Sequence, residues 1–192
     1  MYLSQFNNPS KNNMKFVSKK LKNGATYSGK VRNKKFNGNG TYTFRNGNKY
    51  TGQFVNGNFH GWGIFNFFNG AIYKGYWKNN NFHGKGQIIY APGVNETYDG
   101  DWKNGLEEGI GYHYNDNSKI GYLGNWVNGK RQGIGIYLYS NHCARVCMFK
   151  ENKRTHTSKE LKFIFKGNKI SLQNKIKICP QNEIRSEWNN YQ

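Results

Sequence analysis

Residues 50–72 read YTGQFVNGNFHGWGIFNFFNGAI, and this arrangement of glycines and aromatic residues occurs five times in the chain. Each copy begins with a Y-x-G triplet, and a G-x-G triplet follows eleven residues after its tyrosine. Successive copies lie 23 to 25 residues apart and begin at Tyr27, Tyr50, Tyr73, Tyr98 and Tyr122. A fixed period in this range predicts a solenoid or an extended array. Such an array works through its long surface, so we expect the chain to bind its partners rather than convert them.

Each copy is predicted to form a β-hairpin. Asn-Gly pairs, which favour the type I′ turns of hairpins, recur within and between the copies, at residues 23–24, 46–47, 56–57, 69–70, 104–105 and 128–129. In the third copy the turn glycine is replaced by Asn80, which also tolerates a left-handed backbone. The link at Ala91-Pro92-Gly93 makes the next interval two residues longer, so a wider loop is expected there.

Glycines and aromatic rings are expected to interlock on one face of this meander. Because side chains alternate between the faces of a strand, Tyr50, Gly52 and Phe54 share a face, as do Gly61 and Gly63 of the following strand. A bare glycine leaves room for a flat ring on the neighbouring strand. The prediction gives this structural role to every glycine of the two triplets: Gly29, Gly38, Gly40, Gly52, Gly61, Gly63, Gly75, Gly84, Gly86, Gly100, Gly109, Gly111, Gly124, Gly133 and Gly135.

The motif Y-x-G-x-aromatic, followed by G-x-G and a further aromatic residue, resembles the MORN repeat (membrane occupation and recognition nexus), and residues 27–140 hold its five copies. The resemblance implies an all-β fold, an elongated single-layer antiparallel meander of tandem hairpins with an aromatic groove along one face. The candidate partner-binding residues of that groove are Tyr50, Phe54, Phe65, Tyr73, Trp77, Tyr98, Trp102, Tyr122 and Trp126. His113 replaces an aromatic or aliphatic residue of the other copies and is interpreted as a polar edge of this face.

The repeats are expected to occupy residues 24–140, between two basic flanks. The N-terminal flank, residues 1–23, holds a possible partial strand at Met14–Lys22. The C-terminal extension, residues 141–192, holds candidate strands that extend or cap the sheet, at Val146–Phe149, Leu161–Phe165 and Lys169–Ile178, with a turn at Gly167-Asn168. A short helix near Ser158–Phe163 is an alternative for part of this extension. Residues 1–13 and 180–192 are polar, and we expect them to be mobile or ordered only by a partner.

The chain of 192 residues carries a formal net charge of +19. Residues 1–23 hold five basic and no acidic groups, residues 24–140 thirteen against six, and residues 141–192 eleven against four. Lys169, Lys175 and Lys177 form a candidate basic surface on the last predicted strand. The excess predicts an acidic partner: anionic lipid, nucleic acid or an acidic protein surface. Nucleic acid is favoured least, because most rings are already committed to covering glycines and are not free to stack on bases.

The cysteines favour neither disulfides nor zinc. Cys143, Cys147 and Cys179 are odd in number and accompany no secretory signal, so reduced thiols are expected. In a strand Cys143 and Cys147 would lie about 13 Å apart. The nearby His142 and His156 do not supply the second ligand pair that structural zinc requires. No apolar run approaches the ~18 residues of a membrane span, so we expect a soluble or peripheral chain.

The sequence predicts neither catalysis nor a cofactor. Glu107 and Glu108 are expected in a hairpin turn, where neighbouring carboxylates cannot face each other across a cleft. The G-x-G pairs are predicted inside strands, whereas a nucleotide-binding glycine loop joins a strand to a helix. The resemblance extends to accessory halves of lipid kinases and of a lysine methyltransferase. The 52 residues after the last copy are too few for either catalytic domain, so we do not expect an enzyme.

The second face of the sheet is predicted to be partly apolar. Its residues are Thr41, Thr43, Ile64, Phe68, Ile89, Tyr112, Tyr114, Ile136 and Leu138. A single-layer sheet with apolar side chains on both faces requires a partner, or its own tail, to cover one of them. This requirement favours a protein-binding role.

The leading hypothesis is a non-catalytic scaffold that binds other proteins of a larger assembly through its sheet. Proteins built mostly of MORN repeats, which this chain resembles, occur in cytoskeletal and ciliary assemblies, including axonemal radial spokes, and at membrane junctions. The resemblance therefore implies a cytoplasmic location at the cytoskeleton, cilium or membrane periphery. The alternative is a peripheral membrane module that binds anionic lipid or phosphoinositide, because each basic residue near an anionic leaflet contributes about 1 kcal/mol.

Overall fold

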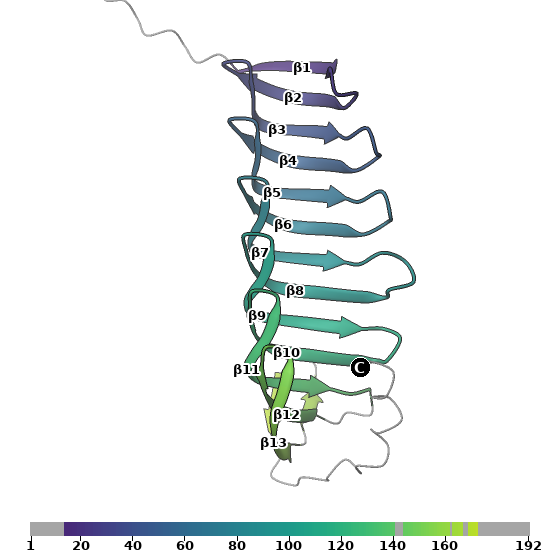
Figure 1. Ribbon diagram of the computed structural model, residues 1–192, viewed down its shortest axis with the longest axis vertical. Coiled ribbons are helices and arrows are strands. Elements are labelled where there is room, and N and C mark those ends of the chain that lie inside the picture. Colours follow the sequence, from purple (N-terminus) through teal and green to yellow (C-terminus); the bar gives the residue numbers. More distant parts are fainter. Residues whose placement is uncertain (1–13, 141–143, 162, 167–168, 173–192) are drawn as a thin grey trace, which may run out of the picture.

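The computed structural model describes residues 14–140, 144–161, 163–166 and 169–172, with the side chains of residues 14–140 and 144–155. All regular elements of these residues are strands, and thirteen of them form one antiparallel sheet in chain order (Figure 1). These are β1 (Lys15–Lys20), β2 (Thr26–Arg32), β3 (Lys35–Thr43), β4 (Lys49–Val55), β5 (Asn58–Asn66), β6 (Ile72–Lys78), β7 (Asn81–Ile89), β8 (Glu96–Lys103), β9 (Leu106–Asn115), β10 (Ile120–Val127), β11 (Lys130–Leu138), β12 (Ala144–Lys150) and β13 (Lys153–Leu161). A separate two-stranded sheet contains β14 (Phe163–Lys166) and β15 (Lys169–Leu172). The predicted all-β antiparallel meander is confirmed.

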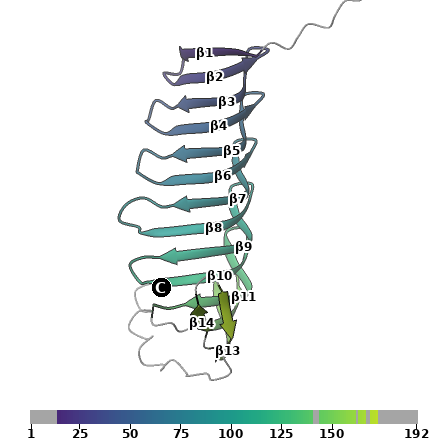
Figure 2. The ribbon, with the colours of Figure 1, turned by 180° about the vertical axis from the view of Figure 1, so that it is seen from behind.

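The large sheet is an elongated ladder whose strands lie across its long axis (Figures 1 and 2). Turns within the copies line the edge at the left of Figure 1, and loops between the copies line the opposite edge. The strands predicted in the flanks extend the ladder: Met14–Lys22 contains β1, and Val146–Phe149 lies within β12. The sheet therefore continues beyond the five copies at both ends.

The C-terminal extension differs from prediction in two elements. The predicted strand at Leu161–Phe165 is divided between β13, which ends at Leu161, and β14, which begins at Phe163. The helix considered near Ser158–Phe163 is wrong, since Lys153–Leu161 forms β13 and pairs with β12, for example through Ala144 and Leu161. The edge strand β12 would otherwise expose unpaired backbone N–H and C=O groups. A further strand can hydrogen-bond to these groups along its length, whereas a helix cannot. The predicted strand at Lys169–Ile178 is described as far as Leu172, and the turn at Gly167-Asn168 lies outside the described residues.

Each repeat is organised by a tyrosine that lies over two glycines. In the second copy Gly52 pairs with Gly63 across β4 and β5. A Cβ on Gly52 would lie 2.5 Å from the Gly63 Cα, and a Cβ on Gly63 would lie 2.5 Å from the Tyr50 ring. The Tyr50 hydroxyl donates a hydrogen bond to the Gln53 carbonyl at 2.8 Å. The same arrangement recurs at Tyr27, Tyr73, Tyr98 and Tyr122.

The first glycine of each G-x-G triplet does not have the role that the sequence analysis gave it. Gly52 pairs with Gly63 and the next residue, Gln53, pairs with His60, so Gly61 and Trp62 are extra residues in a bulge. Gly61 has φ of +57°, and its equivalents Gly38, Gly84, Gly109 and Gly133 also have positive φ. A Cβ on Gly61 would meet the Gln53 side chain rather than a tyrosine ring. Strict alternation fails there because a bulge interrupts the pairing.

The six Asn-Gly pairs form two kinds of turn. Within copies, both residues have positive φ at residues 56–57, 104–105 and 128–129, as type I′ turns require. Between copies, at residues 23–24, 46–47 and 69–70, only the glycine does. There the asparagine side chain accepts a backbone hydrogen bond from two residues further on, as Asn46 does from Asn48 at 3.1 Å. These are Asx turns in longer loops, so the type I′ prediction is wrong for them.

The two predicted departures from the repeat pattern are confirmed. Asn79 and Asn80 both have positive φ and preserve the turn of the third copy. The loop that contains Pro92 runs from the end of β7 at Ile89 to the start of β8 at Glu96. The corresponding loop of the second copy is shorter, from Asn66 to Ile72.

We predict that Gly63→Ala destabilises the sheet far more than Gly57→Asn. A methyl group on Gly63 collides with Tyr50, at a cost of about 2–3 kcal/mol typical of overpacking. Gly57 has φ of +93° with open space around its Cα, and asparagine tolerates this region, so we expect a loss within about 1 kcal/mol. Urea unfolding followed by circular dichroism measures both free energies. Equal losses in the two variants would contradict this role of Gly63.

Candidate partner-binding groove

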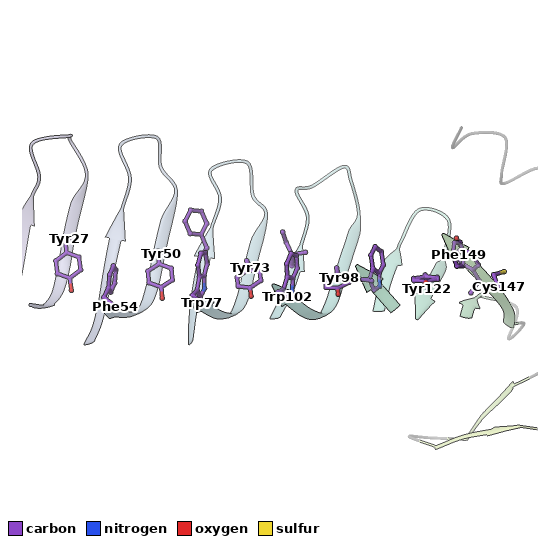
Figure 3. Close-up of a cluster of buried hydrophobic side chains, with 14 residues drawn as sticks. Tyr27, Tyr50, Phe54, Tyr73, Trp77, Tyr98, Trp102, Tyr122, Cys147 and Phe149 are labelled. Carbon is purple, nitrogen blue, oxygen red and sulfur yellow. The ribbon is translucent and has the colours of Figure 1, made fainter. Parts of the chain in front are cut away.

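An inner row of aromatic rings runs along one face of the sheet (Figure 3). The five tyrosines alternate with Phe54, three tryptophans and Phe149, with edge-to-face ring contacts such as 5.1 Å between Tyr50 and Trp77. The tryptophans Trp77, Trp102 and Trp126 each donate their indole N–H to the carbonyl of a glycine beneath a tyrosine, at 2.8 to 3.2 Å. All of these rings are at most 6% exposed. The inner row is therefore the core of the thirteen-stranded sheet, and over residues 14–140 it is buried by side chains of that sheet itself.

An outer row of rings covers the inner row in the first three copies. Phe36, Phe59 and Phe82 stack on Tyr27, Tyr50 and Tyr73, with ring centroids 3.8, 3.9 and 3.7 Å apart. The outer rings are only partly buried. Burial under them raises the pKa of Tyr50 and Tyr73, because the charged phenolate would lose its hydration.

The outer row forms the floor and walls of a groove of about 620 Å³. The groove is lined by Phe36, Tyr42, Phe44, Phe54, Gly57, Phe59, Phe65, Phe67, Trp77, Asn80, Asn81, Phe82 and Gly105. It therefore extends over β3 to β7 and reaches the turn between β8 and β9. Apolar concave surfaces of this kind are the usual binding sites of apolar side chains.

Hydrogen bonds between neighbouring turns fix the position of the outer row. Gly57 donates its backbone N–H to the Phe36 carbonyl at 2.9 Å, and Gly105 donates to the Phe82 carbonyl at 2.9 Å. The Phe59 carbonyl accepts from the Asn80 N–H at 3.1 Å. Each turn thus holds the outer-row residue of the preceding copy, so the groove is preformed by the backbone of the repeats.

The residues predicted to form the groove are divided between its surface and its underlying core. Phe54, Phe65 and Trp77 line the groove, although Phe54 and Trp77 also belong to the inner row and all three are buried. The other six, Tyr50, Tyr73, Tyr98, Trp102, Tyr122 and Trp126, are no more than 6% exposed and belong to the inner row. That the groove binds a partner stays a prediction. Sequence reasoning missed most of its surface, including Phe36, Phe59 and Phe82, although a phenylalanine nine residues after the tyrosine in three copies was a usable signal.

The outer row changes from aromatic to charged in the last two copies. Glu107 and Arg131 occupy the positions that correspond to Phe36, Phe59 and Phe82, because their carbonyls accept the equivalent turn hydrogen bonds, at 2.9 and 3.1 Å. The Arg131 guanidinium lies 5.1 Å from the centre of the Tyr122 ring and donates a hydrogen bond to the Tyr137 hydroxyl. A cation over ring faces replaces the stacked phenylalanine in the fifth copy.

Glu107 and Glu108 are not in a turn, as was predicted, but on β9. The turn closes at Asn104-Gly105, and Glu107 and Glu108 then pair with Trp102 and Asp101 of β8. Glu107 lies on the aromatic face and Glu108 on the opposite face, where it is 3.8 Å from the Lys103 Nζ. The prediction placed the turn too late because it did not anticipate the two extra residues of the bulge in β9.

A small polar cluster adjoins Glu107 on the aromatic face. His113 lies on this face, as predicted, with its Nε2 3.3 Å from a Glu96 carboxylate oxygen. The other Glu96 oxygen accepts a hydrogen bond from the Asn115 side chain at 2.7 Å. Burial lowers the pKa of His113, and the negative charge of Glu96 partly opposes this shift.

The opposite face of the sheet combines exposed aromatic residues with lysines. Trp62 and Tyr76 pair directly across β5 and β6 and are 47% and 52% exposed, and Phe16 of β1 is 71% exposed. Strand alternation places Lys49 and Lys74 on this face. Phe68, predicted for this face, instead lies in the loop between β5 and β6 and is 73% exposed.

The remaining predicted features involve residues that the structure describes only in part. Cys147 is a buried free thiol, and Cys143 and Cys179 lie outside the described residues. Within the described part of the chain, no three His, Cys, Asp or Glu side chains are grouped to hold a metal. Of the candidate basic surface, Lys169 begins β15, whereas Lys175 and Lys177 lie outside the described residues. The described residues include no helix long and apolar enough to span a membrane.

Comparison with known proteins identifies the repeat. The sequence model of the MORN repeat matches residues 27–49, 50–72, 73–94, 98–119 and 122–144, more than half of the chain. These segments correspond to the five copies that begin at the inner-row tyrosines. No curated protein matches the chain in a sequence search.

We predict that His113 makes the sheet less stable in mild acid. Because its pKa is lowered on folding, the folded state binds fewer protons than the unfolded state, so stability falls as the pH drops below the ordinary value of about 6.5. His113→Tyr restores the residue found at the equivalent Tyr42 and Tyr137 positions. Urea unfolding at about pH 7 and about pH 5 should show a smaller loss of stability for this variant than for the native chain. An equal loss of stability in the native chain and in His113→Tyr would contradict this role of His113.

Proposed function

This chain belongs to the MORN-repeat family, and we propose that it is a non-catalytic scaffold that holds a segment of a partner protein in its aromatic groove. MORN repeats generally mediate interactions with proteins or membrane lipids. The observation that carries the proposal is the outer row of phenylalanines, which leaves an apolar groove of about 620 Å³ open on one face. Partly exposed aromatic side chains in a preformed pocket are the usual anchors of protein interfaces.

The size and rigidity of the sheet support a place in a larger assembly. Thirteen strands at a spacing of about 4.8 Å give a platform roughly 58 Å long. From the second copy onward, the turn within each copy is hydrogen-bonded to the preceding copy, which ties neighbouring repeats together. We place the protein in a cytoplasmic assembly at the cytoskeleton or cilium, such as an axonemal radial spoke. The net charge of +19 suits the acidic surface of a filament lattice.

A second candidate function is that of a peripheral membrane module, which the opposite face favours. Trp62 and Tyr76 are exposed there, with Lys49 and Lys74 on the same face. Aromatic rings at headgroup depth together with lysines near anionic lipid are the usual features of peripheral membrane binding. The two functions use opposite faces of one sheet, so variants can separate them.

Phe67→Ala should release the protein from its assembly, whereas Phe68→Ala should not. The two residues are neighbours in one loop and lose the same side chain, but Phe67 lines the groove and Phe68 does not. Loss of a groove anchor lowers affinity on the order of tenfold or more. The measurement is detergent extraction of cells that express tagged variants, followed by a salt wash of the insoluble cytoskeletal fraction. Equal retention of both variants would contradict a role for the groove.

Sedimentation with vesicles tests the membrane function separately. Phosphatidylcholine vesicles, with or without phosphatidylserine, are compared with phosphoinositide vesicles of matched surface charge. If the protein is a membrane module, it prefers phosphoinositide at equal charge, and Trp62→Ala weakens binding while Phe67→Ala does not. Binding that follows charge alone, and is lost in salt, would contradict a specific lipid function.

A further inference from the structure

The aromatic groove ends in a carboxylate. Along the outer row, Phe36, Phe59 and Phe82 are followed by Glu107, whose backbone is held by the same type of turn hydrogen bond, from Gly129 at 2.9 Å. The position that carries an apolar ring in three copies therefore carries a negative charge in the fourth.

Glu107 directly adjoins the groove. It pairs across the sheet with Trp102, and the Trp102 ring lies 5.2 Å from the Phe82 ring of the groove lining. The Tyr90 hydroxyl donates a hydrogen bond to Glu107 Oε1 at 3.4 Å. A side chain that leaves the groove past Phe82 would meet this carboxylate next.

The carboxylate is not neutralised by a neighbouring cation. Among residues 14–140 and 144–155, no lysine or arginine lies within salt-bridge distance of Glu107. The next residue of the row, Arg131, is engaged with the Tyr122 ring and the Tyr137 hydroxyl. A second carboxylate, Glu96, lies on the same face, and both glutamates act electrostatically on His113.

The charge of the chain is opposite at the two ends of the groove. Residues 14–35, which precede the groove, contain eight basic residues and no acidic residue, whereas residues 96–128 contain six acidic and two basic residues. On the aromatic face beyond the other end of the groove, Lys15 and Lys19 of β1 share the side of Val17, which packs against the core. A basic group of a partner is therefore attracted to the Glu107 end and repelled from the β1 end.

We propose that the groove binds a protein segment whose apolar side chains end in a lysine or arginine, with that cation placed against Glu107 and Glu96. The inference rests on the proposed function and adds to it the chemistry and the direction of the bound segment. From β3, which carries Phe36, to β9, which carries Glu107, six strand spacings span about 29 Å. Charge-assisted hydrogen bonds from a guanidinium or ammonium group to carboxylates fix such a segment in one orientation.

The test is a peptide selection on the immobilised full-length protein, with Glu108 as the matched control. The library holds random peptides of about twelve residues, which span roughly 40 Å when extended. The native chain and Glu108→Lys should both select apolar peptides that end in lysine or arginine. Glu107→Lys should lose this preference, select acidic residues at that end, and bind the best native peptide on the order of tenfold more weakly. Both variants change the charge equally, in adjacent residues on opposite faces of β9.

The alternative outcomes separate this inference from the proposed function. The native chain and Glu107→Lys could select the same apolar peptides without a basic end, and Phe67→Ala could fail to bind them. That result would overturn the inference and leave the groove function standing. No selection, or selection unaffected by Phe67→Ala, would overturn both. A dimer in sedimentation equilibrium that Phe67→Ala dissociates would assign the groove to a second copy of the chain and overturn the inference. Circular dichroism confirms that each variant is folded.

Discussion

The close packing of one tyrosine ring on two glycines is the constraint on which the structure depends. The paired Gly52 and Gly63 leave no space for a Cβ, since their backbones and the Tyr50 ring fill it. The tyrosine hydroxyl, carried over the glycines, donates to a carbonyl of its own strand. Five repetitions of this unit give a sheet whose core, among the described residues, is buried by the side chains of the sheet itself. Stability is therefore distributed along the array, as in other repeat proteins.

This packing also determines where function can reside. The inner rings are covered by their neighbours and by the outer phenylalanines, so a partner meets Phe59 or Phe67 rather than Tyr50. The outer row can vary because the space above the paired glycines is filled by the tyrosine ring and the backbone. The chain uses that freedom in its fourth and fifth copies, where Glu107 and Arg131 replace phenylalanine. The repeat backbone thus keeps one geometry while the groove changes from apolar to charged.

The sequence predicted the fold more completely than it predicted the residues of the candidate site. The Tyr-Gly spacing and the Asn-Gly turns determined the strand order and the face of the inner row, because both signals are local. The bulge at Gly61 was missed because it inserts two residues. An even number of extra residues keeps Phe59 and Phe65 on the same face, so the sequence pattern does not show it. The groove residues were predicted from the aromatic positions that recur in every copy. Those recurring rings are the most deeply buried, so most of them lie beneath the groove surface. The face on which Glu107 lies depends on where the turn closes and how β8 pairs with β9, and composition and charge counts do not give this pairing.

The measurement that tests the central packing most directly is a spectrophotometric pH titration of the tyrosines, with circular dichroism followed in parallel. Burial raises the pKa of the Tyr27 and Tyr122 phenols to about 12, and raises the pKa of Tyr50, Tyr73 and Tyr98 as well. The inner-row tyrosines should ionise only well above the ordinary value of about 10, together with loss of the sheet signal. A single transition near pH 10 for all tyrosines, with an unchanged sheet signal, would contradict the account.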